Sequence, residues 1–179
     1  MTALVASSDF VVLSMQRSGT TTMCNLINTL NESTCAYELL NFGPNNAGAR
    51  WLAKIGQNDR PLTANEQLNF VKAVHAENRG THFGFKIFPG HARNLTHLLM
   101  GLTTFKPIVH VRLDDLKHFK SIRRAHQTNC WGTTPDQQKD CKAWTFTRDP
   151  QAEMDFKLKK YGWYSYILRV APNAILSTF

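Results

Sequence analysis

The stretch from residue 10 to residue 30 most constrains the fold, because a buried strand, a tight loop and a helix follow one another directly there. Phe10 to Leu13 form a short apolar run that is typical of parallel strands covered on both faces. Beyond the loop, apolar residues recur at the spacing of one helix face, and these are Met23, Leu26, Ile27 and Leu30. A loop between a strand and a helix N-terminus presents free backbone N–H groups and the positive end of the helix dipole, which favours binding of an anion.

The loop itself departs from the P-loop pattern of a glycine, four residues, and then Gly-Lys-Ser/Thr. Ser14 stands at the first glycine position, Gly19 at the second, and Thr20 stands where the lysine belongs. The cation lies inside the loop instead, at Arg17, so the lysine that reaches the outer phosphates of a nucleoside triphosphate is missing. This pattern argues against hydrolysis of ATP or GTP and favours another nucleotide-linked anion. An ordinary strand–turn–helix without a ligand is the alternative.

A second basic element follows the apolar strand predicted at 107–112, which ends in Arg112. The next helix begins at Asp114 and carries Ser121, nine residues after that arginine. A guanidinium fork binds two phosphate oxygens at once and a hydroxyl adds one more donor, so this pair is suited to a phosphate group. A basic helix face turned to solvent is the alternative interpretation.

Together these two elements resemble the donor site of sulfotransferases that use 3′-phosphoadenosine 5′-phosphosulfate (PAPS). The run from Arg17 to Thr21 is similar to their 5′-phosphosulfate loop. Arg112, Ser121 and the run 125–131 are similar to the 3′-phosphate motif of bacterial and carbohydrate members, with His126 in place of an arginine. The resemblance implies that the 3′-phosphate is held by Arg112 and Ser121, and the 5′-phosphosulfate by Arg17, Ser18, Gly19, Thr20, Thr21 and Thr22.

The same resemblance implies a reaction: transfer of a sulfuryl group from PAPS to an acceptor hydroxyl, without a metal. The implied acceptor is a small molecule or glycan, with a carbohydrate or similar polyol as the first choice. The resemblance covers residues 1–179 as a single sulfotransferase-like domain. We expect this domain to lack the C-terminal part of the usual fold.

Three titratable residues near predicted strand ends are candidates for catalysis. Glu38 ends a strand predicted at 34–40, and ligands of parallel sheets bind beyond the carboxyl ends of strands. Its carboxylate can take the proton of an acceptor hydroxyl. The resemblance implies this role for a glutamate in a comparable place. The alternative is a solvated carboxylate without a catalytic role. Lys86 interrupts an apolar strand, where a lysine is costly unless paired, and it can stabilise charge during transfer. His91, in the turn that follows, is a second candidate base or a plain turn residue.

The remaining pattern predicts an α/β fold: a P-loop-like, mainly parallel sheet flanked by helices on both faces. A capping box at Thr63 begins one helix, Asn94 caps the next, and Asp149 before a proline begins a last helix to about residue 170. An apolar strand follows at 174–179. We expect the last helix to bury one stripe, made of Met154, Leu158, Tyr161, Ser165 and Leu168.

Charge and composition narrow the functional classes. The chain has 21 Lys and Arg against 13 Asp and Glu, a net charge of +8 that suits a donor with several negative charges. A nucleic-acid binder can have the same charge, but the sequence contains no helix-turn-helix or aromatic–basic RNA motif. No run approaches about 18 continuous apolar residues, so we expect no membrane span in this chain. Two alternatives remain: a P-loop nucleotide kinase or NTPase-like protein, and a non-catalytic nucleotide-binding pseudoenzyme.

The four cysteines, at positions 24, 35, 130 and 141, have no metal-ligand spacing and no C-x-x-C pair. We expect buried free thiols, with a bridge between Cys130 and Cys141 as the alternative in an oxidising compartment. The compartment stays open: the cytoplasm if Met1 begins the whole protein, and the Golgi lumen if the chain belongs to a longer one.

Overall fold

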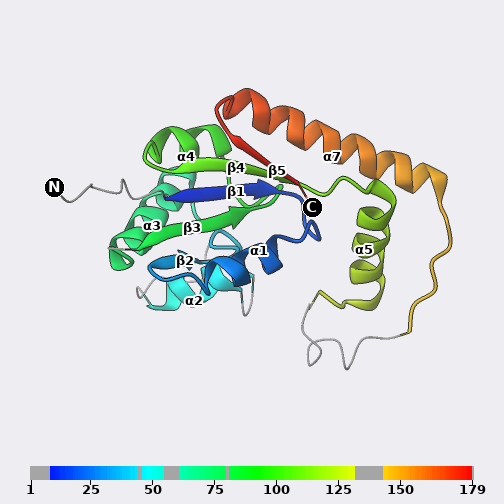
Figure 1. The fold of residues 1–179 in the computed structure, drawn as a ribbon, viewed down its shortest axis with the longest axis horizontal. Coiled ribbons are helices and arrows are strands. Elements are labelled where there is room, and N and C mark those ends of the chain that lie inside the picture. Colours follow the sequence, from blue (N-terminus) through cyan, green and yellow to red (C-terminus); the bar gives the residue numbers. More distant parts are fainter. Residues whose placement is uncertain (1–8, 44–45, 55–60, 80, 132–142, 179) are drawn as a thin grey trace.

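A five-stranded, all-parallel sheet forms the centre of the molecule in the computed structural model, which describes residues 9–43, 46–54, 61–79, 81–131 and 143–178 (Figure 1). The strand order is β2-β3-β1-β4-β5, so β1 lies in the middle and β2 and β5 form the edges. The strands are β1 Phe10–Ser14, β2 Ser33–Cys35, β3 His82–Ile87, β4 Lys106–Val111 and β5 Ile175–Thr178. Parallel neighbours need long crossover connections, and helices supply them here. The predicted α/β class is therefore confirmed.

Six helices lie in the described part of the chain: α1 Thr20–Ile27, α2 Ala47–Lys54, α3 Ala64–Glu77, α4 Leu95–Gly101, α5 Asp115–Thr128 and α7 Pro150–Val170. Four of them begin after a residue whose side chain accepts a backbone N–H bond, and these residues are Thr63, Asn94, Asp114 and Asp149. Each cap satisfies a donor that the first helical turn leaves unpaired. The predicted capping box is present between Thr63 and Glu66.

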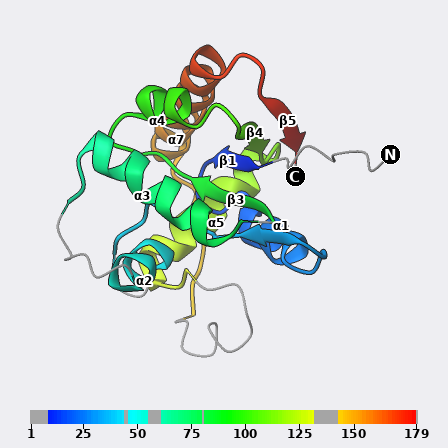
Figure 2. The ribbon, with the colours of Figure 1, turned by 90° about the vertical axis from the view of Figure 1, so that its left-hand side faces the viewer.

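Alternate residues of β1 enter two separate cores, because successive side chains of a strand point to opposite faces of the sheet. Val11 and Leu13 join the larger core, which α3, α4 and α7 cover. Phe10 and Val12 join a smaller core beneath α1. Figure 2 shows α3 and α4 on one side of the sheet and α1 on the other. This two-sided burial explains why the whole of β1 is apolar up to Leu13.

The predicted apolar face of the first helix is only partly correct. Met23 and Ile27 pack against the smaller core, but Leu26 is 66% exposed and Leu30 lies beyond the end of α1. Cys24 takes the fully buried position of the helix instead. The helix is turned so that Thr21, Cys24 and Asn25 contact Lys86, Cys35 and Tyr37 respectively, and these contacts matter for the site described below.

The predicted inward stripe of α7 is wrong. Met154, Leu158, Tyr161, Ser165 and Leu168 all face solvent, and the buried side of α7 instead contains Phe156, Lys160, Tyr164 and Ile167. Polar contacts with the sheet explain this choice of face. The Tyr164 hydroxyl donates to the His110 carbonyl at 3.0 Å, and Lys160 Nζ donates to the Arg112 carbonyl at 2.5 Å. A helix with apolar residues on several sides is oriented by the groups that need a partner when buried.

Two neighbouring residues of α7 test this orientation. Ile167 is fully buried, whereas Leu168 is 50% exposed. We expect Ile167→Ala to lower the free energy of unfolding by about 2–5 kcal/mol, because it leaves a cavity in the core. Leu168→Ala is expected to change it by no more than about 0.5 kcal/mol. Urea unfolding of the two variants measures both effects. A larger loss of unfolding free energy for Leu168→Ala than for Ile167→Ala would instead support the inward stripe predicted from the sequence.

Candidate functional site

One cavity of about 870 Å³ opens at the carboxyl ends of β1, β3 and β4. Parallel α/β sheets commonly bind their ligands at this edge. All the residues proposed from the sequence for binding or catalysis line the cavity, except Ser18; they are Arg17, Gly19, Thr20, Thr21, Thr22, Glu38, Lys86, His91, Arg112 and Ser121. Residues that are far apart in the chain are therefore brought together around one space.

Ser18 belongs to the support beneath the loop. Its side chain is buried, and its Oγ lies 2.6 Å from Ser14 Oγ, which itself donates to the His110 carbonyl at 2.5 Å. His110 Nε2 lies 3.1 Å from the Ser18 carbonyl, and its Nδ1 lies 3.1 Å from Ser177 Oγ on β5. Burial lowers the pKa of His110, while its hydrogen bond to the Ser18 carbonyl acts against that shift. A neutral ring that donates from Nε2 and accepts at Nδ1 fits both contacts.

Arg17 joins the two basic elements found in the sequence. Its backbone is left-handed (φ 61°), and its Nε donates to Ser121 Oγ at 3.1 Å, across 104 positions of chain. Arg112 in turn donates to the Arg17 carbonyl at 3.0 Å. Burial and the positive charges of Arg124 and Arg112 lower the pKa of the Arg17 guanidinium. Several cations held close together in this way favour binding of a polyanion.

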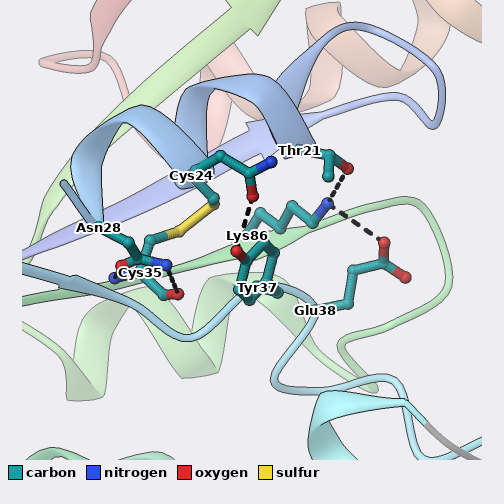
Figure 3. The surroundings of a disulfide bond; sticks show 8 residues. Thr21, Cys24, Asn28, Cys35, Tyr37, Glu38 and Lys86 are labelled. Atoms are coloured by element: carbon teal, nitrogen blue, oxygen red, sulfur yellow. Dashed lines mark hydrogen bonds and ion pairs between the residues drawn. A yellow bond between two sulfur atoms is a disulfide. The ribbon is translucent and has the colours of Figure 1, made fainter. Parts of the chain in front are cut away.

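Lys86 reaches the loop from β3. Its side chain is 2% exposed, its Nζ donates to Thr21 Oγ1 at 2.9 Å, and it lies 3.3 Å from Glu38 Oε1 (Figure 3). Burial lowers the pKa of Lys86, and the nearby Glu38 carboxylate acts in the opposite direction. The Lys86 ammonium therefore lies at the N-terminus of α1. The position of the P-loop lysine itself is occupied by Thr20.

Glu38 lies in a turn and not at the end of a strand. The strand predicted at 34–40 ends at Cys35, because Tyr37 adopts a left-handed conformation (φ 55°) that interrupts the extended chain. Glu38 is 28% exposed, and its Oε2 accepts from Asn41 Nδ2 at 2.8 Å. The carboxylate is thus oriented on both oxygens while part of it faces the cavity.

His91 is less suited to accept a proton. The Phe88 backbone N–H donates to His91 Nδ1 at 3.4 Å, which assigns the proton of the neutral ring to Nε2. Burial lowers the pKa of His91; the Glu38 carboxylate acts against this shift and Lys86 adds to it. The neutral ring therefore has its one basic nitrogen occupied.

Several cavity residues were not predicted from the sequence. Asn41 orients Glu38, and the carbonyl of Trp131 accepts from Arg17 Nη1 at 2.8 Å. Other members of the lining are Gln16, Asn25, Tyr37, Asn46, Ala47, Arg50 and Phe88. Two of these residues lie in stretches quoted above: Trp131 is in the run 125–131, and Gln16 is in the loop between the first strand and helix.

The expectation of free thiols is wrong for the cysteines in the described ranges. Cys24 on α1 and Cys35 on β2 form a disulfide with a Cα–Cα distance of 5.3 Å (Figure 3). Cys130 is also disulfide-bonded. The predicted alternative of a bridge from Cys130 to Cys141 involves a residue outside the described ranges.

Comparison of the sequence with protein-family models and with curated proteins gave no match. The case for a function therefore depends on the residues and their geometry. Within the described ranges, no group of three or more His, Cys, Asp or Glu side chains is arranged to hold a metal ion. Of the helices that the structure describes, none is both long and apolar enough to span a membrane.

His118 on α5 gives this site a pH-dependent support. Its side chain is buried, Nε2 donates to the Gln16 carbonyl at 2.7 Å, and Nδ1 has no hydrogen-bond partner in the described structure. Burial lowers the pKa of His118 to about 4, although its bond to the Gln16 carbonyl opposes the shift. Between about pH 4 and pH 6.5, the ring is therefore neutral in the folded protein and protonated in the unfolded chain.

Because its folded pKa lies below the ordinary value of about 6.5, His118 stabilises the fold above that pH, and this contribution is lost as pH falls toward 4. The full shift corresponds to at most about 3–4 kcal/mol. Urea unfolding between pH 4 and 7 should show a steeper loss for wild type than for His118→Gln. A difference between the two proteins that stays constant with pH would contradict this role.

Proposed function

We propose that this domain is a PAPS-dependent sulfotransferase that transfers a sulfuryl group to an acceptor hydroxyl, with carbohydrates as the acceptor class. The observation that carries the proposal is the hydrogen bond from Arg17 to Ser121, supported by the bond from Arg112 to the Arg17 carbonyl. It joins the two sequence elements that resemble the 5′-phosphosulfate loop and the 3′-phosphate motif. A donor with phosphate groups at both ends of its ribose requires these two elements side by side.

The chemistry of the lining agrees with that donor. The loop offers backbone N–H groups at the N-terminus of α1, and Arg17, Arg112 and Arg124 supply positive charge nearby. Trp131 and Phe88 add aromatic surface to the cavity. A nucleotide kinase is less well supported, because Thr20 replaces the P-loop lysine and Lys86 is paired with a carboxylate.

Glu38 is the proposed general base. The acceptor oxygen forms a bond to sulfur as the bond from sulfur to the 5′-phosphate oxygen breaks, and the electron pair of that bond passes to the leaving phosphate. The acceptor proton passes to the Glu38 carboxylate. The Lys86 ammonium, 3.3 Å from Glu38, offsets the charge that develops on the phosphosulfate oxygens. His91 is less suited because its Nδ1 already accepts a hydrogen bond.

Nucleotide binding tests the donor site. We expect calorimetry to show selective binding of 3′-phosphoadenosine 5′-phosphate over ADP and ATP. Arg112→Ala should weaken that binding by about 1.5–3 kcal/mol, the value of a hydrogen bond to a charged group. Lys106→Ala is the matched control, since Lys106 lies on the same strand at the opposite, amino end. Equal or tighter binding of ATP would overturn the proposal and favour the kinase alternative.

Turnover tests the base. Glu38→Gln keeps the shape of the side chain and removes its basicity, so we expect sulfuryl transfer to fall by about 10²–10⁴-fold. Binding of 3′-phosphoadenosine 5′-phosphate should persist. The comparison is His91→Gln, for which we expect a much smaller loss. A larger loss for His91→Gln than for Glu38→Gln would assign the base to His91, and normal donor binding without any transfer by wild type would indicate a pseudoenzyme.

A further inference from the structure

One face of α1 is linked repeatedly to the segment that leads to Glu38. The linking residues are Cys24, Asn25 and Asn28, at the spacing of a single helix face, and Thr21 on the same face accepts from Lys86. Cys24 is bonded to Cys35. Asn28 contacts the same residue twice: its Oδ1 accepts from the Cys35 N–H at 2.6 Å, and its Nδ2 donates to the Cys35 carbonyl at 3.2 Å.

Tyr37 continues these links to the residue next to Glu38. Its hydroxyl donates to Asn25 Oδ1 at 2.7 Å, and its carbonyl accepts from the Lys86 N–H at 2.8 Å. Figure 3 shows the disulfide, the Tyr37 ring and the Lys86 side chain lying in succession beneath α1, with Glu38 at the far end. The backbone before Glu38 is therefore held by α1 on one side and by β3 on the other.

The short length of β2 makes these links necessary. It is an edge strand of three residues, Ser33–Cys35, and it pairs with β3 alone. A strand of this length contributes few ladder hydrogen bonds, and the turn that follows contains the left-handed Tyr37. Glu38 comes three residues after Cys35, so the disulfide is the nearest covalent constraint on its position.

We propose that the Cys24–Cys35 disulfide is a positioning element for the transfer reaction: it holds Glu38 against Lys86 and beside the phosphosulfate loop. This inference rests on the proposed sulfotransferase function. Cys24 is 0% and Cys35 2% exposed, so the disulfide lies in the interior of the folded protein.

The effect should fall on turnover and leave donor binding intact. The loop is supported from the opposite side, where Ser14 and His110 hold Ser18 and Arg112 holds the Arg17 carbonyl. Loss of the disulfide leaves these contacts in place. It releases the turn that positions the carboxylate, and small misplacements of a reacting group have large effects on rate.

The test compares wild type with Cys24→Ala/Cys35→Ala in PAPS-driven transfer. We expect kcat to fall by about 10–100-fold, with the KM for PAPS unchanged. Leu26→Ala is the matched control, because Leu26 is on the same helix, faces solvent and should leave both constants unchanged. A folded double variant with wild-type kcat would overturn the inference, and so would equal losses of kcat and of affinity for 3′-phosphoadenosine 5′-phosphate.

If this double variant fails to fold, Cys24→Ser/Cys35→Ser decides the question, because serine keeps nearly the size of cysteine and only the covalent bond is lost. We expect the same fall in kcat, again without a change in the KM for PAPS. An unchanged kcat in the serine variant would overturn the positioning role of the disulfide.

Hydrogen exchange separates failure of this inference from failure of the proposed function, since it requires no transfer reaction. The Ala36 amide donates to the Gly84 carbonyl on β3, and the Leu39 and Asn41 amides donate to carbonyls within the Glu38 segment. In either double cysteine variant, we expect faster exchange in peptides covering 36–41 and no change in α4. If wild type transfers no sulfuryl group, the proposed function is wrong, and unchanged exchange at 36–41 would independently overturn the positioning role.

Discussion

The buried ammonium of Lys86 is the interaction on which the site depends. A lysine in the interior of a central sheet is strongly unfavourable unless its charge is paired and hydrogen-bonded. Here the pairing comes from Thr21 at the start of α1 and from Glu38 in the turn after β2. One unfavourable residue on β3 therefore brings the N-terminus of α1 and the Glu38 carboxylate together at the edge of the sheet. The same strand could not tolerate Lys86 if either partner were placed elsewhere.

Much of the fold follows from local patterns. The apolar run of β1, the capping residues and the basic strand end at Arg112 each act within a few positions of chain, and the helices and central strands lie where these patterns predict them. Because parallel strands end at a common edge, the residues at those ends were also expected to meet. They line one cavity, with Ser18 turned inward beneath the loop.

The remaining features depend on distant contacts or on conformations without a sequence signal. The buried face of α7 is selected by Lys160 and Tyr164, whose partners lie on β4 and at its end. Nothing in the identity of Tyr37 predicts its left-handed backbone, so the early end of β2 was missed. The cysteine spacing did not predict the Cys24–Cys35 bond either, because four cysteines allow three connectivities and only the folded chain brings this pair together.

The edge strand β5 is linked through the His110 ring to the loop that precedes α1. Ser177 on β5 contacts one nitrogen of the His110 ring, and the other nitrogen contacts the Ser18 carbonyl in the loop after β1. If a neutral imidazole loses its partner at one nitrogen, its tautomer or its ring orientation can change. Either change also alters the contact at the other nitrogen. The pairing of the outermost strand is thus coupled to the loop before α1 through a single imidazole ring. Docking or displacement of β5 would therefore alter the direction of the Ser18 carbonyl, two strands away, and with it the backbone of the loop before α1.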